Sequence, residues 1–539
     1  MSRRSLSGAV ITALVLVAWT PATARSQIGP SHWDADERVL VTSFQRVTAL
    51  ARSPDRLFAA TDEGLVVRNE AFGQWELPIT REDGYPPSRV TALAWDRRDG
   101  TLWLATEDAR LIQLEPFDRR FVDEIRLNER ISRIIPSADD PSQLLVRTRG
   151  GWFSMDPFSR QMTGLDATAA DRAISADFEL RERRELLSNP RFDAARAFLA
   201  TRGSTHYQIT DVMPATELGQ FWVSSYGGFL FRYDSFTGLA TPVDYGLVGR
   251  GGGAVLVDET GTWFAPGEVT DRYAITWADP ELAVWRTWES ESIGPMDRDL
   301  PSDPIHVLLR RGNDLWAGGD RGVYRFDGKA WHREATGQIG VGQRVLSLAS
   351  GPDDLAGTWV GTDRGLFRLQ GPGALAGSVM LGARRITALA SHAGGLWVGT
   401  DWGLAGFESA AGLPVATSSE GQPRGPVTSL RASGSRLYAG IDRDVWWLED
   451  KVWHRADALG ALSAPASALE VRDGIVFIGS DDGLIAWNTN SGEQRRFSFA
   501  AGDLPTGSRG EEGVMAVSAI GPDVVWLTTP AGAMRLTLD

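Results

Sequence analysis

The residues in this chain most able to bind a ligand are arginines that recur at one position of a repeated unit. Each of them comes directly before a short apolar segment, such as Val47-Thr-Ala-Leu50. The five arginines are Arg46, Arg89, Arg130, Arg344 and Arg385. Guanidinium groups bind carboxylates, sulfates and phosphates through paired hydrogen bonds. If the repeated units place these arginines at one edge, the sequence predicts a site for an acidic ligand.

Aromatic and histidine side chains could complete such a site. Tyr226 and Trp402 lie in turns of the repeated unit, where their rings could stack on sugar rings. His306 stands where other units carry Thr, on a segment that we expect to face a central channel. The candidate binding face therefore combines the five arginines with Tyr226, Trp402 and His306. The alternative is structural, because each arginine could instead pair with an Asp-containing turn and hold neighbouring units together.

Signatures of catalysis and of metal binding are missing from the sequence. It contains no P-loop, no Cys nucleophile, no His-Glu-x-x-His and no Gly-x-Ser-x-Gly. The six histidines stand singly, without the spacing of metal ligands. The Asp-x-Gly segments are typical of turns and lack the alternating carboxylates of a calcium loop. We therefore predict no catalytic residue, no metal site and no cofactor, and we favour a binding protein over an enzyme.

A repeat of about forty residues must position these side chains. One unit contains Arg385-Ile-Thr-Ala-Leu-Ala390, followed by Leu396-Trp-Val-Gly-Thr-Asp-Trp-Gly-Leu404. The second segment predicts a strand with both faces buried, ending in a turn whose Gly has a positive φ. Segments of this second kind recur around Phe58, Trp103, Val146, Trp222, Trp263, Trp316, Trp359, Trp397, Tyr438, Phe477 and Trp526.

The length and pattern of the unit predict an all-β fold, a β-propeller of about eleven four-stranded blades. The last unit ends in its third strand, and Val39-Leu-Val-Thr-Ser-Phe44 is a spare strand that we expect to complete it. Because a ring usually has about four to eight blades, we expect two rings, with one large ring as the alternative. The boundary is expected near residues 280–304. That gives a first propeller region at 25–300 and a second at 301–539.

The pattern apolar-Trp-apolar-Gly-Thr-x-x-Gly-Leu resembles the two-component regulator propeller repeat. It is clearest at Leu396–Leu404, Thr358–Leu366 and Leu315–Val323. The resemblance covers most of the chain and implies a sensory propeller outside the cytoplasmic membrane. Similar repeats also occur in secreted propellers that stand alone. Because the sequence shows no kinase segment and no second membrane span, we expect a stand-alone secreted β-propeller.

The first 24 residues have the pattern of a secretory signal peptide. Arg3 and Arg4 precede an apolar segment, and Ala22-Thr-Ala24 offers a cleavage site. We therefore expect a periplasmic or extracellular protein without a transmembrane span after cleavage, with an uncleaved anchor as the alternative. The absence of Cys excludes disulfides and a lipoprotein anchor. The net charge of −14 argues against nucleic acid as a partner.

An insertion at about residues 164–203 interrupts the repeat. Asn189-Pro190 predicts the start of a helix whose apolar stripe contains Phe192, Ala195, Phe198 and Leu199, and residues 169–187 predict a second helix. This helical insertion could pack on the propeller, or it could dock a partner or act as a lid.

These features favour an exported, non-enzymatic β-propeller that recognises a ligand or a partner protein, as a sensor-like module or a scaffold. The candidate partners are a glycan, a peptide, another anionic ligand or an envelope protein. One alternative is a lyase or hydrolase that acts on polysaccharides. Another is a structural component of an envelope or secretion assembly.

Overall fold

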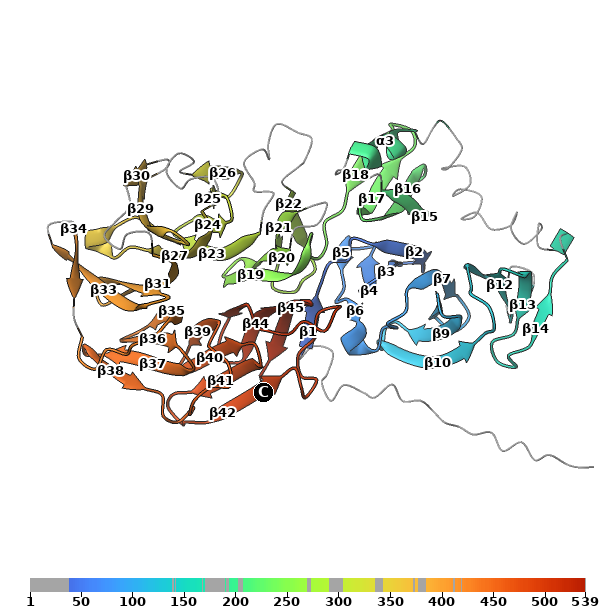
Figure 1. Cartoon of the computed structure of the whole chain (residues 1–539). Helices are drawn as coiled ribbons and strands as arrows, with labels where there is room; N and C mark the ends of the chain where they lie inside the picture. Colours follow the sequence, from blue (N-terminus) through green and yellow to red (C-terminus); the bar gives the residue numbers. More distant parts are fainter. Residues whose placement is uncertain are drawn as a thin grey trace, which may run out of the picture.

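The computed structural model confirms the all-β fold, with eleven antiparallel sheets. It describes residues 38–137, 140, 142–166, 168–169, 190, 193–201, 207–268, 273–289, 304–334, 343–371, 374–376, 384–410, 413–417 and 419–538. The predicted signal peptide, Asn189 and the helix expected at residues 170–187 lie outside these residues. Figure 1 shows the sheets in two neighbouring groups, which we call the first and second group of sheets.

The first group contains four sheets, each running as a meander, although the last short strand of the first sheet pairs with that sheet's third strand. Their strands are β2 (Val47–Arg52), β3 (Arg56–Thr61), β4 (Gly64–Asn69), β5 (Gln74–Trp75) and β6 (Ile79–Thr80); β7 (Val90–Asp96), β8 (Thr101–Thr106), β9 (Arg110–Glu115) and β10 (Arg120–Arg126); β11 (Arg133–Pro136), β12 (Leu144–Thr148), β13 (Gly151–Met155) and β14 (Met162–Gly164); and β15 (Gln208–Pro214), β16 (Gln220–Tyr226), β17 (Phe229–Asp234) and β18 (Ala240–Pro242). A short 3-10 helix, η1 (Arg81–Asp83), follows β6.

The second group contains the other seven sheets. Their strands are β19 (Arg250–Asp258), β20 (Gly261–Glu268), β21 (Ala274–Ala278) and β22 (Trp285–Glu289); β23 (Ile305–Arg311), β24 (Asp314–Gly319), β25 (Gly322–Phe326) and β26 (Trp331–Glu334); β27 (Val345–Ser350), β28 (Thr358–Thr362), β29 (Gly365–Gly371) and β30 (Ala374–Ala376); β31 (Ile386–His392), β32 (Gly395–Thr400), β33 (Gly403–Ala410) and β34 (Leu413–Thr417); β35 (Val427–Ser433), β36 (Arg436–Ile441), β37 (Asp444–Glu449) and β38 (Val452–Arg455); β39 (Ala468–Arg472), β40 (Ile475–Ser480), β41 (Gly483–Asn488) and β42 (Gln494–Ser498); and β43 (Ala516–Ala519), β44 (Val524–Thr529), β45 (Gly532–Thr537) and β1 (Arg38–Val41). A 3-10 helix, η3 (Asp353–Leu355), precedes β28.

The first strands of the sheets pack side by side. In the first group β2 packs beside β7, β7 beside β11, and β15 returns to β2. In the second group the order is β19, β23, β27, β31, β35, β39 and β43, and β43 packs against β19. These contacts place the sheet β19–β22 with the sheets that follow it, although the sequence analysis put it in the first region. Whether each group is a separate domain stays a prediction.

The strand expected to complete the last sheet does so. β1 pairs antiparallel with β45, from Arg38 opposite Leu536 to Val41 opposite Ala533. The sheet therefore takes its outer strand from the beginning of the described chain and its other three strands from the end. This pairing covers the edge of β45, which would otherwise present free backbone groups.

The recurring aromatic residues of the second strands fill the space between sheets. Trp103, Trp359 and Trp526 are each at most 2% exposed, and each packs with residues of an adjacent sheet. Gly365 and Gly403, which follow the Asp-containing turns, have φ values of +142° and +144°, as the turn chemistry predicted. Burial of apolar strands from both sides explains why these segments have no polar alternation.

The described helix of the insertion, α3 (Asp193–Thr201), packs on the sheet β15–β18. Ala195 is fully buried, and the Phe198 ring lies 5.0 Å from the Phe231 ring. Two members of the predicted apolar stripe thus face the sheet, while the side chains of Phe192 and Leu199 lie outside the described part of the chain. For this helix, packing on the sheets is the observed arrangement.

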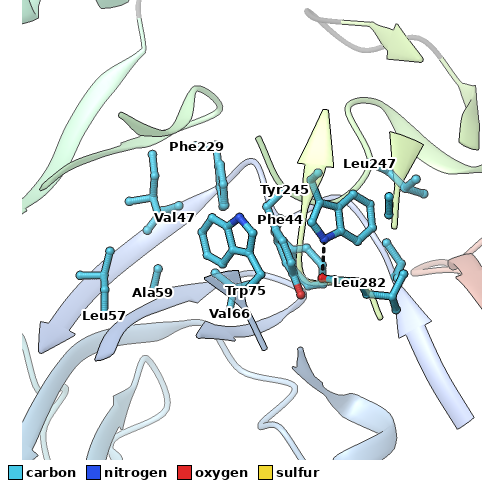
Figure 2. Close-up of a cluster of buried hydrophobic side chains, with 14 of the residues drawn as sticks. Phe44, Val47, Leu57, Ala59, Val66, Trp75, Phe229, Tyr245, Leu247 and Leu282 are labelled. Carbon is cyan, nitrogen blue, oxygen red and sulfur yellow. Dashed lines mark hydrogen bonds between the residues drawn. The ribbon is translucent and has the colours of Figure 1, made fainter. Parts of the chain in front are cut away.

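One hydrophobic core joins the two groups of sheets. Tyr245, in the connector between β18 and β19, lies 4.4 Å from the Trp75 ring and 5.1 Å from the Trp285 ring, measured between centroids. Figure 2 shows Tyr245 beside Phe44 and Trp75, with Phe229 nearby. Because these side chains come from both groups, their burial fixes the connector against both.

Candidate functional site

Three of the predicted arginines face an acid of the preceding sheet. Each arginine precedes a first strand, and its partner lies in or beside the turn between the second and third strands of the sheet before it. The pairs are Arg89 with Asp62 at 3.8 Å, Arg130 with Glu107 at 2.9 Å, and Arg344 with Asp320 at 3.3 Å. For these three arginines the structure shows the pairing between neighbouring sheets that was the alternative to ligand binding.

Arg46, Arg89 and Tyr226 come together in the first group of sheets. The guanidinium carbons lie 5.5 Å and 4.6 Å from the centre of the Tyr226 ring, so two cations contact one ring. The Tyr226 hydroxyl donates a 2.7 Å hydrogen bond to Asp62. Burial, followed by this contact with Asp62, raises the pKa of Tyr226. The phenol therefore stays protonated at neutral pH and is poorly suited to act as a base.

His306 lies in a second cluster, in the second group of sheets. Its Nε2 is 2.7 Å from Asp320 Oδ1, the atom that Arg344 also approaches. His306 occupies a β-bulge, because the register of β23 against β24 shifts between Ile305 and Val307. Equivalent bulges in β2, β7 and β31 carry Thr48, Thr91 and Thr387, so His306 stands at a threonine position as predicted.

Arg385 and Trp402 join neither cluster. Within the described residues Arg385 makes no hydrogen bond, ion pair or ring contact, and Trp402 is 78% exposed with Arg384 6.0 Å from its ring centre. The eight candidate residues thus divide into a Tyr226 cluster, a His306 cluster and isolated positions. Their role in binding stays a prediction.

A cavity of about 150 Å³ lies where the two groups of sheets meet. Arginines from three parts of the chain line it: Arg46 before β2, Arg81 in η1 and Arg250 at the start of β19. All three side chains are exposed, and none makes a hydrogen bond or an ion pair with a described residue. The other lining residues are Leu40, Thr42, Ser43, Gln45, Asp62, Glu63, Glu82, Tyr207, Gly227, Val248, Gly251, Pro505, Thr506, Ser508, Pro530 and Ala531.

Two acids that line this junction cavity, Glu63 and Glu82, have raised pKa values. Burial raises the pKa of Glu63, although Arg81, Arg250 and Arg46 oppose the effect. Burial also raises the pKa of Glu82, which forms an ion pair with Arg38 of β1. Arg38 is 5% exposed in its side chain, so this pair links the closing strand of the second group to η1 of the first.

The start of β19 approaches the last sheet of the second group closely at the cavity. Gly251 has φ +60°, and a β-carbon there would lie 3.0 Å from the Pro530 carbonyl oxygen. A side chain at this position would therefore disturb the contact. Arg81 and Arg250 were not found by sequence reasoning, because they lie outside the repeated arginine position. The Gly-Arg-Gly-Gly-Gly segment at residues 249–253 was the available signal.

Other kinds of site are not evident in the described residues. Among them, no three His, Cys, Asp or Glu side chains cluster in a way that could hold a metal ion. No helix in this part of the chain is both long enough and apolar enough to cross a membrane.

Comparisons with known proteins reveal similarity of fold. No protein-family model matches the chain, and no curated protein matches its sequence. The extracellular domain of a hybrid two-component system of B. thetaiotaomicron is similar in structure, with 12% identity, a TM-score of 0.44 and coverage of 92% of this chain and 68% of that chain. PorZ, a bacterial surface component of the type-IX secretion system of Porphyromonas gingivalis, is 10% identical, with a TM-score of 0.34. The match covers 93% of this chain and 87% of PorZ. The β-propeller domain of Doa1 is 10% identical, with a TM-score of 0.40. The match covers 53% of this chain and 92% of that domain.

Proposed function

We propose that the protein is an exported recognition module that binds an acidic ligand in the junction cavity. The observation that carries this proposal is the set of three exposed guanidinium groups, Arg46, Arg81 and Arg250, that line one cavity without an ion-pair partner among the described residues. In a protein of net charge −14, unpaired arginines that converge on a cavity favour an anion.

The acids of the cavity narrow the kind of ligand. Asp62 and Glu63 can accept hydrogen bonds from hydroxyl groups, while the arginines bind carboxylates or sulfates. A ligand that combines hydroxyl groups with acidic groups fits this lining, and acidic sugars have that chemistry. We therefore place an acidic glycan first among the candidate partners.

Three further parts of the proposal rest on the sequence and the packing. The signal-like segment at residues 1–24 supports export to the periplasm or the cell exterior. The contacts of the first strands support two propeller regions that meet at the connector 243–249. Cleavage of a polysaccharide, the enzymatic alternative, has less support, because Tyr226 is held protonated by Asp62 and by burial.

A thermal-shift titration of the full chain with oligogalacturonate tests the proposal. We expect a higher unfolding temperature with this ligand than with an uncharged malto-oligosaccharide. In an Arg81→Ala/Arg250→Ala variant the affinity should fall by roughly 10- to 100-fold per lost charged hydrogen-bonding group. The matched control is Arg344→Ala/Arg385→Ala, which removes two arginines from the second group and should leave the shift unchanged.

The proposal is wrong if oligogalacturonate gives no shift in the unaltered chain. It is also wrong if the Arg81→Ala/Arg250→Ala variant retains the full shift.

A further inference from the structure

A phenylalanine is exposed at the outer hairpin turn of every sheet in the first group. Phe72, Phe117, Phe158 and Phe236 lie between the third and fourth strands of the four sheets, and they are 77%, 56%, 98% and 74% exposed. Single exposed apolar side chains are ordinary on a protein surface, but here one recurs at the same turn of all four sheets.

The four turns belong to one edge of the first group. Strands of a meander alternate in direction, so the turn between strands three and four lies at the same edge as the turn between strands one and two. Two contacts agree with this: Arg56, at the start of β3, lies 4.4 Å from the Phe117 ring, and Phe236 lies against Gly219 before β16. We call Phe72, Phe117, Phe158 and Phe236 the aromatic edge. It is opposite the edge that carries Arg46, Arg89 and Arg130.

Folding of the turns does not require phenylalanine. Asp156 Oδ1 accepts a hydrogen bond from the Phe158 amide at 2.9 Å, and Asp234 Oδ1 accepts one from the Phe236 amide at 2.8 Å. In two sheets of the second group the same turn carries polar residues at the same position. Asp327 binds the amide of Lys329 at 2.8 Å, and Asn488 binds the amide of Asn490 at 2.9 Å.

No ring contact joins any two of these four phenylalanines in the described part of the chain. Among the four rings, only Phe117 has a described aromatic partner, Trp95, at 6.3 Å between centroids. A protein interface concentrates its binding energy in a central cluster of side chains that fill pockets. Isolated rings at the corners of one edge would need a separate pocket each, whereas a fluid lipid surface accepts all of them without matched pockets.

The charges beside the aromatic edge indicate which lipid surface fits. The exposed arginines Arg120 and Arg160 are paired with Glu115 and Asp123, and exposed Arg97 is followed by exposed Asp99 in the same turn. The edge therefore offers no strong excess of positive charge. Anionic membranes attract clusters of unpaired basic residues, and this edge has none of that kind among the described residues of its hairpins. We infer that the aromatic edge docks the protein on the interfacial layer of a zwitterionic phospholipid surface.

The absence of Cys allows a site-specific test on the full chain. Phe158→Cys carries an environment-sensitive fluorophore at one tip, and Lys329→Cys carries the same fluorophore at the equivalent tip of the second group. With phosphatidylcholine vesicles we expect a blue shift and an intensity gain at position 158 and none at position 329. Circular dichroism of both labelled chains checks that they fold alike.

A second arm measures binding without a label. In vesicle co-flotation, Phe72→Asn/Phe236→Asn should reduce the bound fraction by roughly 10-fold per phenylalanine, because each ring contributes the burial of an apolar side chain. Lys329→Asn is the matched control and should bind as the unaltered chain does.

Three results would overturn the inference. The first is vesicle binding with no change at position 158, which would place the contact elsewhere, for example at residues 8–19. The second is an equal change at both tips. The third is a change at position 158 that follows protein concentration without vesicles, because a second copy of the chain would then cover the edge.

Discussion

Threonine hydroxyl groups at the start of the first strands join one sheet to the next. Thr91 Oγ1 donates a 2.6 Å hydrogen bond to the Ile131 carbonyl, and Thr387 Oγ1 donates one of 2.5 Å to the Val427 carbonyl. Both threonines occupy β-bulges, which direct the hydroxyl group toward the following sheet. His306 interrupts this series and binds Asp320 instead.

The recurring threonine position can be recognised in the sequence, but its hydrogen bond to the next sheet cannot. The repeat shows that Thr recurs and that His306 replaces it, because this is a matter of alignment between units. The bulge itself depends on pairing with the second strand, and the bond depends on the next sheet. Neither relation is visible in one unit read alone, so the hydrogen bonds between sheets could not be predicted.

Glu63 gives a pH-dependent prediction at the residue scale. Burial raises its pKa in the folded chain, so the charged form destabilises the folded state above that pKa, and the native state binds the proton more readily than the unfolded state. Glu63→Gln should therefore be more stable than the unaltered chain at pH 7. The difference should disappear as the pH falls below about 4, where the unfolded glutamate is also protonated.

Urea unfolding at pH 7 and pH 4 measures this difference, with the exposed Glu493→Gln as the control. A loss of stability at pH 7 in Glu63→Gln would contradict the prediction. It would mean that attraction to Arg81 and Arg250 outweighs the burial.

The closing strand is the element on which the last sheet depends. Val41 of β1 is fully buried, lies opposite Ala533 of β45, and belongs to the core shared by the two groups of sheets. This closure could be predicted because the last unit lacks a strand and Val39–Phe44 offers one. The partners of Arg38 could not be predicted, because Glu82 belongs to the first group of sheets and reaches Arg38 only where the two groups meet.

A charge at Val41 should open this closure. Val41→Asp places an unpaired carboxylate in an apolar core, which costs about 3–5 kcal/mol, and it should lower the urea midpoint of unfolding. The control is Val122→Asp on β10, where the native side chain is 44% exposed and little change is expected. Equal midpoints for Val41→Asp and the unaltered chain would show that β1 does not hold the last sheet.

At the scale of the whole molecule, the two groups of sheets line one cavity from both sides. Glu63 and Arg81 come from the first group, and Thr506, Pro530 and Arg250 come from the second. The sequence predicted arginines at the repeated position, where three of them pair with acids of neighbouring sheets. The junction cavity depends on how the two groups of sheets meet, and that meeting is determined by Tyr245 and its neighbours rather than by the repeat.

Hydrogen–deuterium exchange of the full chain, with and without oligogalacturonate, tests the central claim most directly. Ligand in the junction cavity should slow exchange in four separate segments, at residues 42–46, 79–84, 248–252 and 504–508. Because residues of all four segments line the cavity, their joint protection would identify the site. Protection confined to the segments of Arg344 and Arg385, or no protection at any of the four, would contradict the account.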